Sequence, residues 1–320
     1  MTVPPPNPDG CTSVGQIVEW GGYPTECTIE GTLYGYLPSL GANAFFAAFF
    51  ALCFIVQLVQ GIRYKTWTYM IALCLGCLGE AVGYGGRLMM HHDPFADTGF
   101  MTQICCLIIS PAFVAAGVYI TLKHIVITFG PSWSRLRPAW YTYIFIVGDV
   151  ISLCLQGAGG GLASAGDTGS TTVDIGTDLM IAGVIFQVVI LSIFAYFTAE
   201  YAIRTHRRRD QLSDESVKLF NSRNFRCFMF AVGVAYLGIF IRCVYRIPEL
   251  TGGWRSELMR NEVEFIVLEG VMIVMSIAVL TIFHPGYCFP ALANTIGKSK
   301  RVARNKSLEE SSDTEVVASR

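Results

Sequence analysis

The apolar residues of this chain fall in seven long blocks rather than in the short periodic runs of a water-soluble protein. A membrane-spanning helix needs about 20 mostly apolar residues, and each block is that long. No block alternates with the two-residue period of a barrel strand. The pattern therefore predicts an all-α membrane protein, a seven-helix transmembrane bundle with spans at residues 36–61, 67–90, 102–129, 140–163, 176–203, 225–247 and 263–285.

Positive charges divide the polar segments between these blocks into two alternating sets. Residues 1–34 contain no Lys or Arg, and neither do the second and fourth connections. The first, third and fifth connections are basic, as is the C-terminal tail. The sixth connection is mixed, with Arg255 and Arg260 against Glu249, Glu257 and Glu262. Because Lys and Arg collect in cytosolic loops, we expect the N-terminus outside the membrane and the C-terminus in the cytosol.

The composition agrees with integral membrane insertion. Hydrophobic residues make up 52% of the 320 residues and charged residues only 15%, whereas soluble domains are about one quarter charged. The mean hydropathy of +0.48 is also high. The net charge of −1 argues against a nucleic-acid partner, which normally binds a basic surface. We expect an extracellular tail (1–34), a bundle (35–288) and a disordered cytosolic tail (289–320). The oligomeric state is left open.

Two of the 11 cysteines, Cys11 and Cys27, lie in the exported tail, and no other cysteine does. The outside of a cell is an oxidising setting in which disulfides form and persist. We therefore expect these two cysteines to pair.

Charged and polar residues inside the predicted spans identify a candidate site. An ionisable group at the centre of a span costs about 2.5–3.5 kcal/mol on insertion scales, so each needs a partner or a function. Seven-residue and four-residue spacings place the members of each set on one helix face. We expect a shared interior cluster, serving either as a polar substrate cavity or as a structural ion-pair network. Its members are Glu80, Arg87, Asp149, Gln156, Arg242, Tyr245, Arg246, Glu262 and Glu269.

The sequence gives no sign of catalysis or of a bound cofactor or metal. The five histidines lie at different depths of the predicted bundle, so they do not supply the three convergent ligands of a zinc site. Nucleotide-binding and nucleophile motifs are absent from the sequence as well. We expect a membrane protein that is not an enzyme.

Several motifs in the order found here resemble the fungal lipid-translocating exporter family, also called the RTA-like family after resistance to aminocholesterol. The resemblance extends over about residues 34–290. Its most specific parts are Glu80 to Arg87 (EAVGYGGR), Gly148-Asp149-Val150 followed by Gln156 to Gly161 (QGAGGG), Arg242 to Arg246 (RCVYR), Glu249, and His284-Pro285-Gly286.

The resemblance implies a translocator of amphiphilic lipids, of the sphingoid-base or phospholipid class, that contributes to stress or drug resistance. It also implies the plasma membrane, with a vacuolar or other endomembrane location left open. Two alternatives remain: a seven-helix receptor or sensor, and a porphyrin or haem transporter. The predicted cluster, with Glu264 added, contains five carboxylates (Glu80, Asp149, Glu262, Glu264, Glu269) and three arginines (Arg87, Arg242, Arg246), an excess that favours a cationic head group or a proton-titrating site.

Overall fold

The computed structural model describes residues 11, 14–20, 23–29, 32, 34–95, 97–130, 135, 137–165, 171–208, 214–252 and 257–289. Within this part of the chain, seven helical segments are long and apolar enough to cross a membrane, which confirms the predicted number. Six are single helices: α1 (Leu40–Tyr64), α2 (Trp67–His92), α3 (Asp97–Phe129), α4 (Pro138–Ala165), α5 (Thr171–Arg207) and α7 (Arg223–Thr251). The seventh consists of α9 (Glu262–Glu264), the π-helix η4 (Phe265–Val271), α10 (Met272–Ile282) and α11 (Pro285–Cys288).

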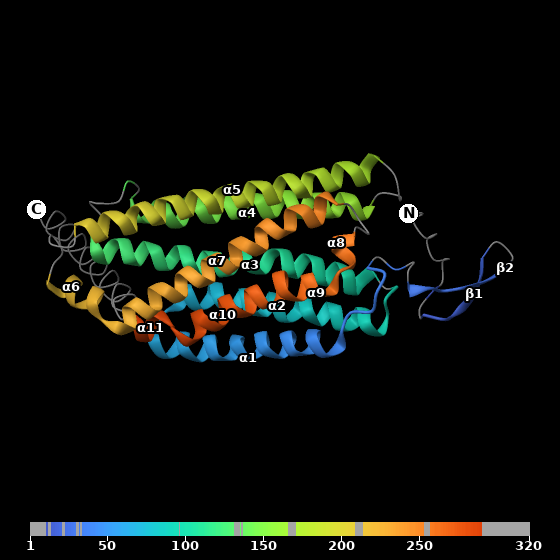
Figure 1. Ribbon diagram of the computed structural model, residues 1–320, viewed down its shortest axis with the longest axis horizontal. Coiled ribbons are helices and arrows are strands. Elements are labelled where there is room, and N and C mark those ends of the chain that lie inside the picture. Colours follow the sequence, from blue (N-terminus) through green and yellow to red (C-terminus); the bar gives the residue numbers. More distant parts are fainter. Residues whose placement is uncertain are drawn as a thin grey trace, which may run out of the picture.

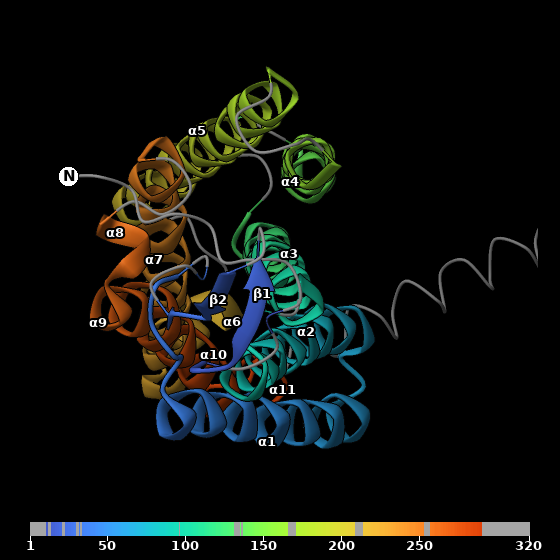
Figure 2. The ribbon, with the colours of Figure 1, turned by 90° about the vertical axis from the view of Figure 1, so that its right-hand side faces the viewer.

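The spans lie side by side along the long axis of the molecule (Figure 1). Seen along that axis, α1 lies at one edge and the α4–α5 pair at the other, with α2, α3, α7 and α10 between them (Figure 2). Large apolar side chains point outward along the whole bundle, and Phe230 and Ile282 are 73% and 70% exposed. An outward-facing apolar surface of this kind fits a lipid surrounding. The helices meet the other requirement of the membrane interior, because each helix satisfies its backbone polar groups internally.

Small residues bring α2 and α3 into close contact. A Cβ atom at Gly86 would lie 2.8 Å from the carbonyl oxygen of Gly99, and one at Gly83 would lie 2.6 Å from Leu107. Small residues that recur every three or four positions along one helix face let two helix backbones approach closely in a membrane. As a result, the backbone of α3 at Leu107 is near enough to α2 to take part in the polar site described below.

The structure extends or shortens several predicted spans. Helix α1 begins at Leu40 rather than residue 36, because Pro38 disfavours helical geometry at the residue before it. Helix α7 continues through Pro248 to Thr251, beyond the predicted end at residue 247. Helix α5 has 37 residues, which makes it longer than the hydrocarbon core of about 30 Å at 1.5 Å per residue.

Other elements were not predicted. Residues of the N-terminal tail form an antiparallel hairpin of β1 (Ile17–Trp20) and β2 (Tyr23–Glu26), with Ile17 opposite Glu26. Unlike these strands, the disulfide between Cys11 and Cys27 was expected from the sequence; it joins residues whose Cα atoms are 5.9 Å apart. Two short helices lie between spans, α6 (Asp214–Asn221) and α8 (Glu257–Arg260). Residues 1–10 and 290–320, which include nearly all of the predicted cytosolic tail, lie outside the described residues.

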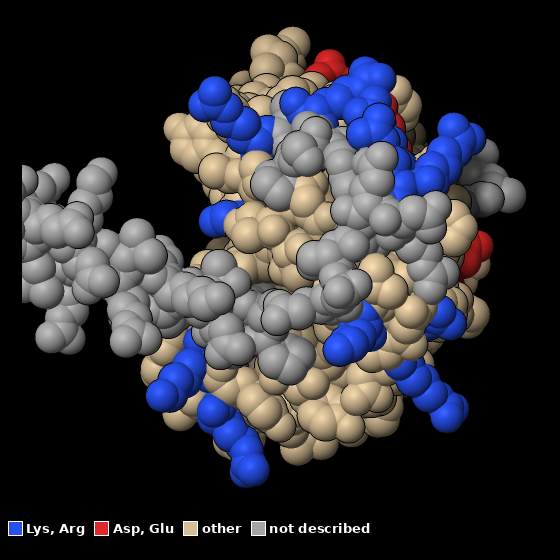
Figure 3. All heavy atoms as spheres, turned by 90° about the vertical axis from the view of Figure 1, so that its left-hand side faces the viewer, with Lys and Arg blue, Asp and Glu red and all other residues tan. Residues whose placement is uncertain are grey.

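The two ends of the bundle differ in charge. The hairpin, α8 and α9 lie at one end, called here the hairpin end, and α6 and α11 lie at the other, called here the basic end (Figure 1). Lys and Arg side chains dominate the charged surface of the basic end, as Figure 3 shows. The basic connections inferred from the sequence therefore meet at one end of the molecule, as the alternation of charges predicts.

Candidate functional site

Arg242 joins four parts of the bundle in the buried interior. Its side chain is 2% exposed. Nη1 donates to Glu80 Oε1 of α2 at 3.0 Å, and Nη2 donates to Glu269 Oε1 of η4 at 2.9 Å. Nη2 also donates to the carbonyl oxygen of Leu107 in α3, at 2.5 Å. One guanidinium group on α7 thus connects α2, α3 and the π-helix.

Arg246, one turn further along α7, extends the same network. It donates to Glu249 Oε2 at 3.0 Å and to Glu269 Oε1 at 2.5 Å. Three carboxylates therefore meet two guanidinium groups, and when all are ionised the net charge is negative. The term central network is used below for these five buried residues: Glu80, Arg242, Arg246, Glu249 and Glu269.

The central network contains hydrogen-bonding capacity that the described residues do not use. The Oε2 atoms of Glu80 and Glu269 are buried and have no hydrogen-bond partner, and the same is true of the Tyr84 hydroxyl. Tyr84 follows Glu80 by one helical turn on α2, and its ring packs on Phe46 and Phe50 of α1. Buried polar groups are normally satisfied, so three orphaned acceptors in one place call for a ligand or for water.

The π-helix sets the position of Glu269. A π turn closes its hydrogen bonds five residues apart and is frequently found at functional sites. It lies where the seventh span passes α1 and α2, and a Cβ atom at Gly270 would lie 2.7 Å from the Phe46 ring. Glycine at this position lets the widened turn pack closely, with the Glu269 side chain fully buried between Arg242 and Arg246.

Arg87 belongs to a separate group near the hairpin end. Its Nε donates to Asn43 Oδ1 at 3.0 Å, its Nη2 to Tyr36 OH at 2.9 Å, and Glu262 Oε1 lies 3.8 Å from Nη2. The guanidinium carbon lies 3.9 Å from the centre of the Phe265 ring. Burial raises the pKa of the Tyr36 phenol, so its hydroxyl stays neutral and accepts from Arg87. This group closes the hairpin end of the bundle.

Two further predicted residues lie apart from the central network. Asp149 Oδ2 accepts a hydrogen bond from Tyr119 at 3.0 Å, with no ion pair to any described residue. Gln156 Nε2 donates to Gln187 at 3.1 Å. Both glutamines line a cavity of about 20 Å³ that also touches Arg242 and Arg246. Such a space holds about one water molecule.

These positions correct one expectation. The predicted site residues are buried with the exception of half-buried Glu262, and each of the three arginines lies within 4 Å of a carboxylate. They do not share one cavity, however. Residues seven apart share a helix face but lie two turns apart, about 10 Å along the axis. Glu80 and Arg87 therefore join different groups, as do Glu269 and Glu262. Tyr245 is buried on α7 without a hydrogen bond to a described residue.

Sequence reasoning missed several partners. Glu249 is not among the predicted site residues, because Pro248 sets the predicted end of its span, although its spacing of three from Arg246 is typical of a helical ion pair. Asn43, Tyr119 and Gln187 are neutral and carried no such signal. In the described part of the chain, no three His, Cys, Asp or Glu side chains converge as a metal ion requires.

The fold and the buried network define a seven-helix integral membrane protein with a polar, net-acidic interior. Residues 73–292 match the family described as RTA1-like protein, which is more than half of the chain. The chain therefore belongs to the RTA1-like family, and the resemblance seen in its sequence motifs is confirmed.

Three yeast proteins illustrate the range of its relatives. The chain is 30% identical over 295 residues to the sphingoid long-chain base transporter RSB1 of Saccharomyces cerevisiae strain S288c. The aligned residues cover 83% of this chain and 77% of that protein. It is 29% identical to protoporphyrin uptake protein 1 of the same strain, over 65% of each chain. It is 23% identical to protein RTA1, over 79% of this chain and 84% of that one. No solved structure matches.

Proposed function

We propose that this protein translocates sphingoid long-chain bases, or single-chain amphiphiles with a similar cationic head group, across the membrane. The observation that carries the proposal is the similarity to the sphingoid long-chain base transporter RSB1 over 83% of the chain. The net-acidic central network supports it, because a positively charged head group needs buried carboxylates. The proposed role is that of a transporter and not of an enzyme.

The unused acceptors of the central network suit a primary ammonium group. An ammonium ion presents three N–H donors and no acceptor. Glu80 Oε2, Glu269 Oε2 and the Tyr84 hydroxyl supply three buried acceptors without partners among the described residues. The rings of Tyr84 and Phe50 stack next to them, with 5.7 Å between their centres, and provide an apolar surface for the first carbons of the chain.

The central network is closed in this structure. The cavity beside Arg242 and Arg246 measures about 20 Å³, far below the roughly 300–1,000 Å³ of ligand pockets. Loading a long-chain base therefore requires α7 to move away from α2 or α3, which breaks the contact of Arg242 with Glu80 or with the Leu107 carbonyl. In this proposal the contacts of Arg242 hold the bundle closed, and the bundle opens when they break.

The positive-inside rule orients the proposed transport path. In this orientation the basic end, where α1 and α5 end with Arg63 and Arg207 in their last turns, faces the cytosol, and the hairpin end faces outward. The plasma membrane is the proposed location. A protease added to intact cells should leave a C-terminal tag uncut, whereas cleavage of that tag without permeabilisation would reverse the orientation.

Reconstituted liposomes with a fluorescent sphingoid base test the function. Glu80→Gln should lower the translocation rate at least tenfold, because it removes the negative charge that an ammonium group would meet. Glu200→Gln is the matched control, since Glu200 pairs with Arg135 and Arg204 at the basic end. Translocation by Glu80→Gln at the wild-type rate would contradict the proposal.

A second variant guards against a folding defect. Tyr84→Phe keeps the stacked ring and removes only the unpartnered hydroxyl, so the protein should fold normally. Its translocation rate should fall by about three- to tenfold if the hydroxyl accepts from the head group, in line with one lost hydrogen bond to a charged partner. An unchanged rate would remove Tyr84 from the site.

A further inference from the structure

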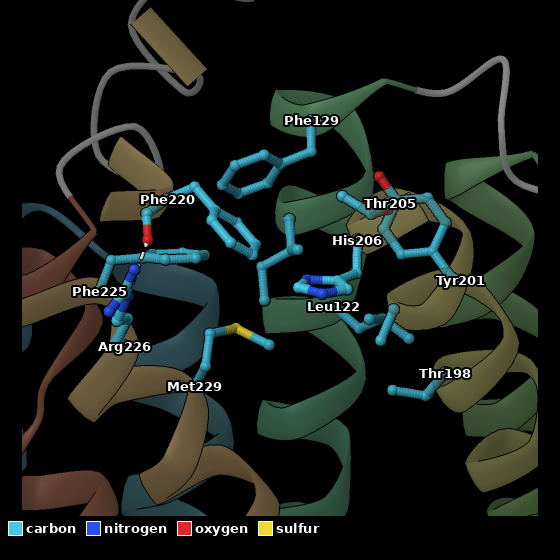
Figure 4. A pocket seen from close by; sticks show the side chains of 12 residues that line it. Leu122, Phe129, Thr198, Tyr201, Thr205, His206, Phe220, Phe225, Arg226 and Met229 are labelled. Atoms are coloured by element: carbon cyan, nitrogen blue, oxygen red, sulfur yellow. Dashed lines mark hydrogen bonds between the residues drawn. The ribbon is translucent and has the colours of Figure 1, made fainter. Parts of the chain in front are cut away.

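A second and much larger hollow lies at the basic end, away from the central network. It occupies about 460 Å³ between α3, α5 and α7, with α6 beside it, a size typical of ligand pockets. Figure 4 shows the aromatic rings of Phe129, Phe220 and Phe225 on one side and side chains of α5 on the other. Most of the lining is apolar, and the term basic-end cavity is used below.

Two threonines of α5 that line this hollow have buried hydroxyl groups. The hydroxyl groups of Thr198 and Thr205, both in the wall of the basic-end cavity, are buried and have no hydrogen-bond partner among the described residues. Threonine in a helix ordinarily donates to the carbonyl of the preceding turn, as Thr121 and Thr128 do in α3. Both hydroxyl oxygens are buried behind the cavity wall, so this side of the cavity presents an apolar surface suited to a hydrocarbon chain.

The charge of the cavity is opposite to that of the central network. Arg226 and His206 line it and are exposed, and the described lining contains no acidic residue. Arg226 is held at this position, because its Nε donates to the Phe220 carbonyl oxygen at 3.3 Å and its Nη2 to Asn221 at 3.4 Å. A cationic amphiphile would meet repulsion here, whereas an anionic head group would be attracted.

We propose that the basic-end cavity binds an anionic phospholipid from the leaflet next to the basic end. Its acyl chain lies among Phe129, Phe225 and Met229, and its phosphate lies beside Arg226 and His206. Basic pockets between helices on the cytosolic side are typical anionic-lipid sites. The site shares no residue with the central network, so it stands independently of the proposed transport activity.

Native mass spectrometry of the purified full-length protein tests this binding directly. With matched acyl chains, phosphatidylserine should bind at least fivefold more tightly than phosphatidylcholine. Arg226→Gln should reduce that preference at least threefold, and Arg63→Gln should not, because Arg63 is an exposed arginine at the same end outside the cavity. Equal binding of the two lipids, or equal effects of the two substitutions, would overturn the proposal.

A cavity-filling variant distinguishes binding of the lipid acyl chain inside the cavity from electrostatic attraction of the lipid head group to the protein surface. Ala202 lines the cavity and is exposed on α5, so Ala202→Trp should leave the bundle folded while it occupies the space of the acyl chain. Phosphatidylserine binding should fall at least tenfold. A phosphatidylserine with a photoreactive acyl chain should label the wild-type protein at Met229 or Phe225, and this label should disappear in Ala202→Trp. Undiminished binding and labelling in the filled variant would exclude the cavity as the site.

Discussion

The central network and the basic-end cavity, two regions of one bundle, differ in charge and in the space that they enclose. The central network combines three carboxylates with two arginines and leaves a space of about 20 Å³ beside it. The basic-end cavity is about 460 Å³ of mostly apolar space with Arg226 and His206 at its edge. A closed region with unused acceptors suits a cationic head group that enters only after a conformational change. An open region with an arginine at its edge suits an anionic lipid that binds to the resting bundle.

Removing the shared cation should have the largest effect on this comparison. Arg242→Met deprives Glu80 of its only ion-pair partner among the described residues and leaves a buried carboxylate uncompensated. Breaking a buried pair from one side costs about 3–5 kcal/mol. The variant should lose that much free energy of unfolding, measured by chemical denaturation in detergent.

The double variant Arg242→Met with Glu80→Met sharpens the same test. Replacing both members of a buried pair by apolar side chains of similar size is often neutral, and Glu269 keeps Arg246 as a partner. The double variant should recover most of the stability that Arg242→Met loses. If it is as unstable as the single variant, the pairing of these two residues is not what stabilises the bundle.

Replacing Asp149 should have a smaller effect on stability than replacing Arg242. Its carboxyl group accepts from Tyr119 and has no ion pair with a described residue, so no charge pair is broken when the group is replaced. Asp149→Asn retains an acceptor for the Tyr119 hydroxyl and should change the free energy of unfolding by less than about 1 kcal/mol. A loss as large as that of Arg242→Met, measured under the same conditions, would show that Asp149 belongs to the ionised core.

The exposed pair at the basic end should matter least. Arg135 contacts Glu200 at 2.8 Å, but its side chain is 57% exposed. Surface ion pairs typically contribute about 0–1 kcal/mol, and Glu200 also has Arg204 as a partner. Arg135→Ala should shift the melting temperature by no more than a degree or two, measured by differential scanning fluorimetry. A larger shift would mean that the basic end is held by charge pairs.

The sequence predicted best what has a large energetic cost. Seven spans and the alternation of basic connections follow from the exclusion of charge from lipid, and the structure reproduces both. The burial of Glu80, Arg242 and Glu269, and the pairing of each arginine with a carboxylate, follow from the same cost. Helical periodicity sets the face of a residue but not its depth, which is why one predicted cluster became several.

Other features could not be predicted because they arise from packing between distant segments. The π turn at Phe265–Val271 is a local change in hydrogen bonding that no residue spacing announces. The basic-end cavity depends on how side chains of α3, α5 and α7 fill, or fail to fill, the space between those helices. The contact of Arg242 with the Leu107 carbonyl depends on the close approach of α2 and α3 backbones.

The central claim is that the head group of a long-chain base binds at the central network. A structure of the protein with bound sphingosine tests it most directly. We expect the amine nitrogen within about 3 Å of Glu80 Oε2 and Glu269 Oε2, with Arg242 displaced from the Leu107 carbonyl. Sphingosine seated in the basic-end cavity with its amine beside Arg226, and an unchanged central network, would contradict the account.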